Sequence, residues 1–173
     1  MSGELITLSI FMTKNATAAE IIAALQLEAL PNEGGFFRPA YRSAVSLSDG
    51  RAAGSAIYFL ITPEGFSALH SLRTEELWHF YAGDPVEHLR LDPATGNGYQ
   101  TRLGSAVLQG QVPLLVVSAG LWQGARLASG GNWALLGCTM SPGWDEREFV
   151  LGERAPLAAT FASWAKEIQS LTR

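Results

Sequence analysis

Short runs of aromatic and β-branched residues, separated by turns that contain glycine, proline or asparagine, fill the middle of the chain. Such runs predict strands, because these side chains favour a pleated and partly buried backbone. The predicted strands span 36–45, 54–61, 66–72, 76–82, 85–92, 99–103, 113–118, 121–128 and 132–140. No helical period interrupts the series. Strands in series without helices indicate a mainly β fold, either an antiparallel sandwich or a barrel.

Helical periodicity is confined to the two ends. In the segment 16–27, Thr17 and Glu20 have the spacing of a capping box, and apolar residues return on one face. Near the C-terminus, apolar side chains spaced by three or four predict a helix over about 156–171 that packs against the strands: Leu157, Phe161, Trp164, Ile168 and Leu171. The 173 residues therefore predict one domain, 1–173, with a β-barrel over about 36–150 between two helices.

Composition and charge exclude several classes of function. The chain carries a net charge of −4, so no basic surface is expected to hold a nucleic acid. No apolar run approaches the roughly 18 residues that span a bilayer, and no cationic region precedes the N-terminal apolar stretch. The lone cysteine, Cys138, excludes an intramolecular disulfide and a cysteine-based zinc site. We therefore expect a cytoplasmic protein with no nucleic-acid or membrane partner.

The densest polar segment spans residues 65–83 and contains two of the three histidines, His70 and His79. It resembles the first motif of the cupins, G-x5-H-x-H-x3–4-E-x6-G. His70 matches the first histidine of that motif, and Glu76 matches the glutamate. Leu72 stands at the second histidine position. In a weaker counterpart of the second cupin motif, over 118–127, Gln123 stands where the last metal-binding histidine would be.

Other segments make the resemblance more specific. The chain is similar to the DUF985, or Cupin_5, family in five ordered segments: 31–43, 55–61, 66–93, 118–127 and 133–155. The resemblance extends over about residues 16–171 and implies a cupin double-stranded β-helix, or jelly roll, with flanking N- and C-terminal helices. Likeness to other cupins of this type also implies a homodimer. Pro31 and Asn32 stand where many members read His-Pro, so no ligand role is carried over to that position.

The residues at the motif positions favour a site without a metal or other cofactor. Metal-dependent cupins use three histidines and a glutamate, and Fe(II) sites use two histidines and one carboxylate. Leu72 and Gln123 remove two of these ligands. His79 lies three residues after Glu76, so in a regular strand the two side chains point to opposite faces.

His70 and Glu76 are the candidate catalytic residues of such a site. A carboxylate near an imidazole fixes its tautomer and raises its pKa, which suits a general base. The resemblance also implies a likeness to nucleotide-sugar 3,5-epimerases, metal-free cupins whose catalytic histidine matches His70. Their enolate-stabilising lysine would fall near Glu76, where a carboxylate would repel an enolate instead.

Further side chains are candidates for binding a ligand at the barrel mouth. Arg38 and Arg42 are four residues apart, so in a regular strand both face one way and can hold a phosphate or carboxylate, with Tyr41 on the other face. A surface ion pair is the alternative for these arginines. Tryptophan rings are candidates for stacking or for wall packing. The expected ligand-binding set is Arg38, Tyr41, Arg42, Ser67, Trp78, Trp122 and Gln123.

Three hypotheses follow for the function. The first is a site for a small anionic ligand, sugar-like or nucleotide-sugar-like, with metal-independent isomerase or epimerase activity. The second is a non-catalytic binding or regulatory cupin that uses the same pocket. The third is a metal-dependent cupin enzyme.

Overall fold

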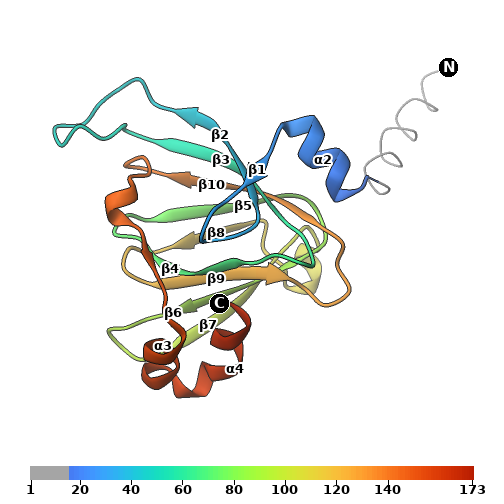
Figure 1. The fold of residues 1–173 in the computed structure, drawn as a ribbon, viewed down its shortest axis with the longest axis vertical. Helices are drawn as coiled ribbons and strands as arrows, with labels where there is room; N and C mark the ends of the chain where they lie inside the picture. Colours follow the sequence, from blue (N-terminus) through green and yellow to red (C-terminus); the bar gives the residue numbers. More distant parts are fainter. Residues whose placement is uncertain (1–15) are drawn as a thin grey trace.

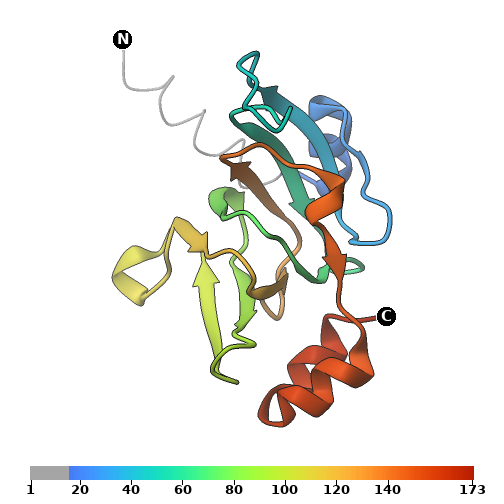
Figure 2. The same ribbon diagram turned by 90° about the vertical axis from the view of Figure 1, so that its left-hand side faces the viewer.

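Two antiparallel sheets face each other in the computed structural model, which describes residues 16–173 (Figures 1 and 2). The strands are β1 (Glu28–Ala29), β2 (Phe36–Arg42), β3 (Ser55–Ile61), β4 (Ser67–Ser71), β5 (Glu76–Gly83), β6 (Val86–Leu91), β7 (Gly98–Leu103), β8 (Leu114–Val117), β9 (Trp122–Leu127), β10 (Ala134–Met140) and β11 (Val150–Leu151). The six-stranded sheet has the order β1-β2-β3-β10-β5-β8, and the five-stranded sheet has the order β11-β4-β9-β6-β7. This arrangement confirms the mainly β jelly roll.

The predicted helices are present at both ends, α2 (Ala18–Leu25) before the strands and α3 (Arg154–Thr160) and α4 (Ala165–Ser170) after them. The capping box is confirmed, because the Glu20 N–H donates to Thr17 Oγ1 and the Thr17 N–H donates to Glu20 Oε2. The prediction of a single helix over about 156–171 was wrong. Phe161 leaves the helical region at φ −118° and ψ 59°, and a 3₁₀ turn (Ala162–Trp164) separates α3 from α4.

Three hydrophobic clusters hold the layers together. The largest fills the barrel between the sheets and includes Phe59, Trp78 and Leu136. A second lies between the outer face of the five-stranded sheet and the C-terminal helices, where Phe161 and Ile168 pack on Leu89. A third lies under α2 on the six-stranded sheet. Figure 1 shows α3 and α4 at one end of the molecule and α2 at the other.

The strands match the predicted runs closely, and the elements that sequence reasoning missed are short. β1 and β11 have two residues each, too few for an alternating pattern. Among the described residues, none of the helices is both long and apolar enough to span a bilayer. The homodimer and the cytoplasmic location stay predictions.

Replacing Ile168 with alanine tests the packing of α4. Ile168 is fully buried against the five-stranded sheet, so Ile168→Ala should lower the free energy of unfolding by about 2–5 kcal/mol. Urea denaturation measures the change. Gln169→Ala, on the exposed side of the same helix, is the control and should stay within about 0.5 kcal/mol of the original. Equal effects of the two substitutions would contradict this packing.

Candidate functional site

A cluster of buried polar side chains lies between the two sheets, beside the hydrophobic core of the barrel. It joins strands that are far apart in the sequence: β4 supplies the first two residues, β5 the next two and β9 the last. The members are Ser67, His70, Glu76, Trp78 and Gln123, and all five are buried. All five belong to the set predicted from the sequence. The fold therefore brings these five predicted residues together.

Hydrogen bonds from two neighbours hold the Glu76 carboxylate. Gln123 Nε2 donates to Glu76 Oε2 at 2.8 Å, and Trp78 Nε1 lies 3.0 Å from the same oxygen. The indole N–H also lies 3.0 Å from Gln123 Oε1, so it is shared between the two acceptors. Glu76 and Trp78 are two residues apart in β5, so both side chains point to the same, inward face. Gln123 points inward from the opposite sheet. Glu76 is therefore fixed by its partners within the buried interior of the barrel.

His70 is placed by its backbone neighbours and covered by an aromatic ring. Its Nδ1 lies 2.8 Å from the carbonyl oxygen of Ala68, so Nδ1 carries a proton and donates it. Its Nε2 lies 4.0 Å from Glu76 Oε2, beyond hydrogen-bonding distance. The ring of Phe149 stacks on the imidazole, with centroids 5.2 Å apart. A register shift between Ser67 and His70 lets β4 present both side chains to the cluster.

Glu33 completes the cluster and was missed as a site residue by sequence reasoning. It accepts a 2.7 Å hydrogen bond from Ser67 Oγ, and its Oε1 lies 3.9 Å from His70 Nδ1. The turn that carries it depends on Gly34 (φ 103°), where a Cβ atom would lie 2.5 Å from the Phe66 carbonyl oxygen. The sequence Glu-Gly-Gly predicts this turn. It gives no indication that the turn reaches the barrel.

Charge decides the protonation state of His70. Burial disfavours the imidazolium, but the carboxylates of Glu33 and Glu76 outweigh burial and raise the pKa of His70 to about 9. Burial also raises the pKa of Glu33, while the charge of His70 opposes that rise. At neutral pH His70 therefore carries a proton on both nitrogens. It can donate a proton, whereas the sequence predicted a general base.

The thiol of Cys138 takes no part in this chemistry. Burial raises its pKa well above the usual value, and Glu76 and Glu33 add to the effect. The thiol stays protonated and packs in the core.

The paired arginines are separated by a β-bulge. The register of β2 against β3 shifts between Pro39 and Tyr41, so Arg38 lies opposite Tyr58 and Arg42 lies opposite Ser55. Tyr58 and Ser55 are three residues apart, so the two arginines point to opposite faces, and the expectation of a shared face was wrong. The Arg38 guanidinium lies over the Tyr58 ring, on the outer face of the six-stranded sheet. Tyr41 lies on this outer face too and is 57% exposed.

Trp122 also lies outside the barrel interior. It precedes the inward-facing Gln123, so it points to the opposite face of β9. There it packs in the hydrophobic cluster under α3 and α4. Its ring therefore packs in the wall and does not stack on a ligand in the barrel. Wall packing was one of the two alternatives predicted for the tryptophans. Trp78 faces inward, but its ring packs edge-on against Phe59 and His88.

The donor set does not fit the metal of metal-dependent cupins. Among residues 16–173, no three histidine, cysteine, aspartate or glutamate side chains gather around one point. Glu33 and Glu76 lie on opposite nitrogen sides of the His70 ring, so they do not converge. Gln123 uses its oxygen as an acceptor for the Trp78 N–H. Imidazole and carboxylate groups, rather than an amide engaged in this way, form such sites.

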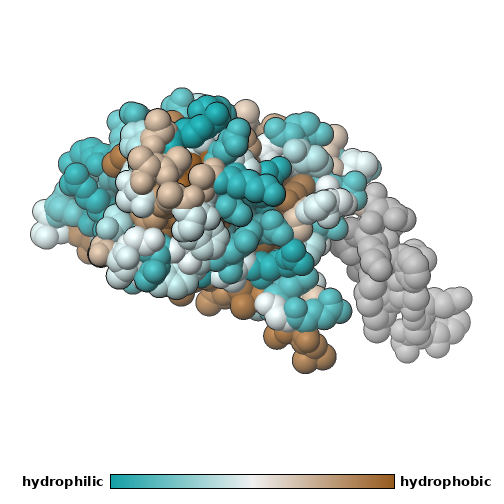
Figure 3. Space-filling view, turned by 90° about the horizontal axis from the view of Figure 1, so that it is seen from below, coloured by the Kyte–Doolittle hydropathy of each residue, from teal (hydrophilic) through white to brown (hydrophobic). Residues whose placement is uncertain are grey.

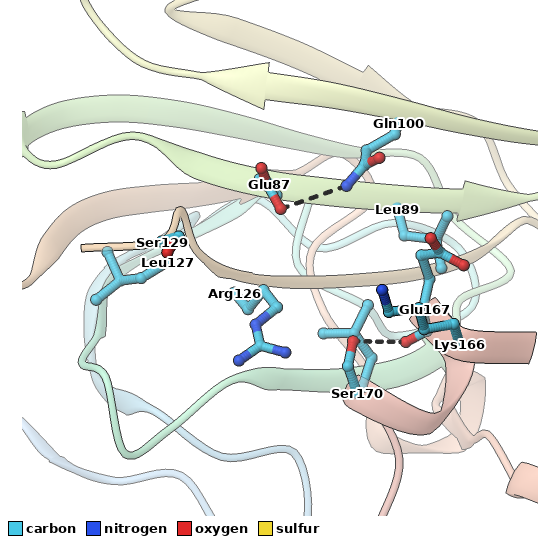
Figure 4. Close-up of a pocket in the computed structure, with 10 residues that line it drawn as sticks. Glu87, Leu89, Gln100, Arg126, Leu127, Ser129, Lys166, Glu167 and Ser170 are labelled. Atoms are coloured by element: carbon cyan, nitrogen blue, oxygen red, sulfur yellow. Dashed lines mark hydrogen bonds between the residues drawn. The ribbon is translucent and has the colours of Figure 1, made fainter. Parts of the chain in front are cut away.

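Two surface grooves lie outside the cluster. One, of about 470 Å³, lies between the five-stranded sheet and α4 and presents both charges, with Arg126 and Lys166 beside Glu87 and Glu167 (Figure 4). The other, of about 710 Å³, lies beside α2 and includes Tyr81. The end of the molecule that carries α3 and α4 is mainly hydrophilic, with hydrophobic side chains along one edge (Figure 3). Neither groove contains a predicted site residue.

Comparison with known proteins agrees with this architecture. Residues 19–152 match the family described as Cupin superfamily (DUF985). The chain belongs to the Cupin_5 family. No sequence among curated proteins matches it.

Solved structures extend the likeness. A protein from Shewanella oneidensis shares 31% identity with this Cupin_5 chain at a TM-score of 0.86, covering 91% of this chain and 98% of that one. A hypothetical protein from Leishmania major shares 31% identity at a TM-score of 0.82, covering 91% and 99%. Oxalate decarboxylase from Bacillus subtilis shares 15% identity at a TM-score of 0.53, covering 85% of this chain and 37% of that one. The last likeness shows the fold alone, and the family has no assigned function.

The raised pKa of His70 predicts a pH-dependent stability. The imidazolium is stabilised in the folded state, so its contribution is complete below the ordinary pKa of 6.5 and is lost as the pH rises through about 9. The free energy of unfolding should fall by up to about 3 kcal/mol across this window, at about 1.4 kcal/mol per pKa unit. Urea denaturation between pH 6 and 10 measures it.

Two variants test whether His70 is the group that causes this pH dependence of stability. His70→Gln should flatten the pH dependence. His79→Gln should retain it, because His79 lies on the outer face of β5 and bonds Thr139. A slope that survives in His70→Gln would assign the titration to another group.

Proposed function

We propose that this Cupin_5 protein binds a small sugar-like ligand inside the barrel and isomerises it by proton transfer. The observation that carries the proposal is the placement of a buried acid and a buried base face to face, with His70 Nε2 4.0 Å from Glu76 Oε2. At this separation, a single ligand oxygen can lie at hydrogen-bonding distance, about 2.8 Å, from both atoms. Two adjacent ligand atoms can also be contacted, one by each group.

His70 and Glu76 have complementary roles in this reaction. The ligand carries a hydrogen on the carbon beside its carbonyl group. Glu76 takes that proton, the electron pair of the C–H bond forms a carbon–carbon double bond, and the carbonyl oxygen takes the Nε2 proton of His70. The product is an enol. Glu76 then gives its proton to the neighbouring carbon or to the other face of the same carbon, and His70 Nε2 takes a proton back from the oxygen that becomes the carbonyl. The product is the isomer or epimer, and no co-reactant is consumed.

This division of roles removes the objection raised by the carboxylate at position 76. A carboxylate repels an enolate when it stays charged. Glu76 becomes neutral in the same step that builds negative charge on the ligand, and the His70 proton neutralises the oxygen. Gln123 and Trp78 donate to Glu76 and hold it in position for the transfer.

Access to the pair depends on the segment that covers it. Phe149 lies over the His70 ring, and the neighbouring Glu148 is held by Thr74, whose Oγ1 donates to it at 2.5 Å, and by Arg51. The strand that follows, β11, pairs with β4 through only two residues. A segment with so few backbone contacts costs less to displace than a strand that is paired along its length. We infer that the ligand enters where Phe149 moves aside.

A ligand-binding role without turnover is the second candidate. The observation that favours it is the burial of His70, which is 2% exposed and balanced by two carboxylates, an arrangement that also stabilises a fixed charge. The same experiment distinguishes the two.

Solvent deuterium exchange tests the isomerase proposal. The protein is incubated in D₂O with nucleotide sugars, sugar phosphates and sugar acids, and NMR follows exchange at the carbon beside the carbonyl. Thermal melts follow binding, since a ligand at 100 times its Kd adds about 2.7 kcal/mol of stability. We expect exchange with one ligand class. Glu76→Gln should slow it about a hundredfold or more while the ligand-induced melting shift persists.

The control is Glu64→Gln, at an exposed turn, which should exchange at the original rate. A melting shift without exchange in the original protein would leave a binding role only. Exchange that survives Glu76→Gln would overturn the assignment of Glu76 as the base.

A further inference from the structure

Strand β6 presents two polar side chains to the barrel interior that the proposed reaction does not use. His88 and Arg90 alternate with Leu89, which packs outward under the C-terminal helices, so both polar side chains face inward. His88 lies opposite Ala125, a residue of the barrel core, which confirms its direction.

Both side chains have polar atoms without a partner. His88 is fully buried, and neither ring nitrogen has a hydrogen-bond partner among the described residues. Arg90 is partly buried, and its guanidinium lies over the Tyr99 ring while Nη2 donates to Thr101 Oγ1 at 2.7 Å. Its Nε is buried and has no hydrogen-bond partner. Buried donors and acceptors in native proteins are almost always paired. Among the described residues, Arg38 Nε on the outer face of the six-stranded sheet is the other such atom, and the three atoms on one face of β6 indicate the place of a missing partner.

These groups continue the row that contains the acid–base pair. Gln123 lies opposite His70 on one side and opposite Arg90 on the other. Neighbouring strands are about 4.8 Å apart, so the backbones of His70 and Arg90 are about 10 Å apart, and both side chains point into the same interior. Trp78, which donates to Glu76, packs edge-on against the His88 ring with centroids 4.9 Å apart. The two places therefore lie within the length of one small ligand.

The chemistry of the two groups defines what they bind. Burial and then the nearby cations Arg90 and His70 lower the pKa of His88 to about 3, against an opposing interaction with the Gln123 side chain, so the ring is neutral. A neutral imidazole offers one donor and one acceptor, which matches a hydroxyl group. The free N–H of the Arg90 guanidinium matches an oxyanion.

We propose that His88 and Arg90 form a second subsite in the barrel, which binds a hydroxyl group and the terminal oxyanion, carboxylate or phosphate, of a sugar-like ligand. The inference rests on the proposed function for the position of the reacting end of that ligand. It replaces Arg38 and Arg42 as the source of anion recognition, since these two arginines do not face one site.

The probes for this subsite are D-glucuronate, glucose 6-phosphate and D-glucose, which differ in the group at one end. Calorimetric titration should show at least tenfold tighter binding of glucuronate or of glucose 6-phosphate than of glucose. Tighter binding of glucuronate would indicate a carboxylate subsite, and tighter binding of glucose 6-phosphate would indicate a phosphate subsite. Arg90→Gln should remove the preference, because the charged donor is lost. Arg126→Gln, on the outer face of the same sheet, should keep it (Figure 4).

His88→Phe gives a second readout that does not depend on turnover. The substitution keeps a ring of similar shape and removes the unpaired nitrogens, so the ligand-free protein should melt at a higher temperature and bind the probes at least tenfold more weakly. Unchanged probe affinity in His88→Phe would overturn the role of His88. An absent oxyanion preference, or one that survives Arg90→Gln, would overturn the subsite.

These outcomes separate the subsite from the isomerase proposal. If the preference is absent while Glu76→Gln still slows deuterium exchange about a hundredfold or more, the subsite fails and the proposed reaction stands. If the preference depends on Arg90 while none of the substrate classes exchanges, the reaction fails and the subsite stands.

Discussion

The burial of one imidazolium between two carboxylates is the constraint on which the candidate site depends. An isolated charge in the buried interior of the barrel would cost more than a domain of this size can offset, so each charge needs a partner. Glu33 and Glu76 supply these partners on the two nitrogen sides of His70. The three elements that carry them, the turn before β2, the strand β4 and the start of β5, must therefore stay in register. The same attraction that makes the fold tolerate the charge also makes His70 a proton donor.

The strand series could be predicted from sequence because alternation and turn chemistry act locally. A run such as 55–61 has a β-branched and aromatic pattern, and β3 forms there. The cluster of His70, Glu76 and Gln123 could be located because motif spacing fixes which strands carry them. The loss of two metal ligands could be predicted from the same motif spacing, because Leu72 and Gln123 stand at histidine positions.

Contacts that depend on register or on turns could not be read from the sequence. A single extra residue in β2 reverses the face of every side chain after it, so Arg38 and Arg42 separate although their spacing suggested a shared face. Glu33 reaches the site only because the two glycines after it take positive φ angles, 103° and 71°. His88 and Arg90 lie on the same face of a strand that was predicted correctly, but nothing in the neighbouring sequence indicates that their nitrogens lack hydrogen-bond partners.

Replacing metal ligands with an amide and an aliphatic side chain changes what the barrel can do. A bound metal would stabilise an anion on the ligand through its own charge. Here Gln123 orients Glu76, and His70 supplies the positive charge together with a transferable proton. Two carboxylates and two cations, His70 and Arg90, face the interior, so the cluster is close to neutral before a ligand binds. An oxyanion beside Arg90 would therefore add the one unbalanced negative charge in the barrel. That charge favours the imidazolium further, which would keep the proton on His70 until the carbonyl oxygen of the ligand becomes basic enough to take it.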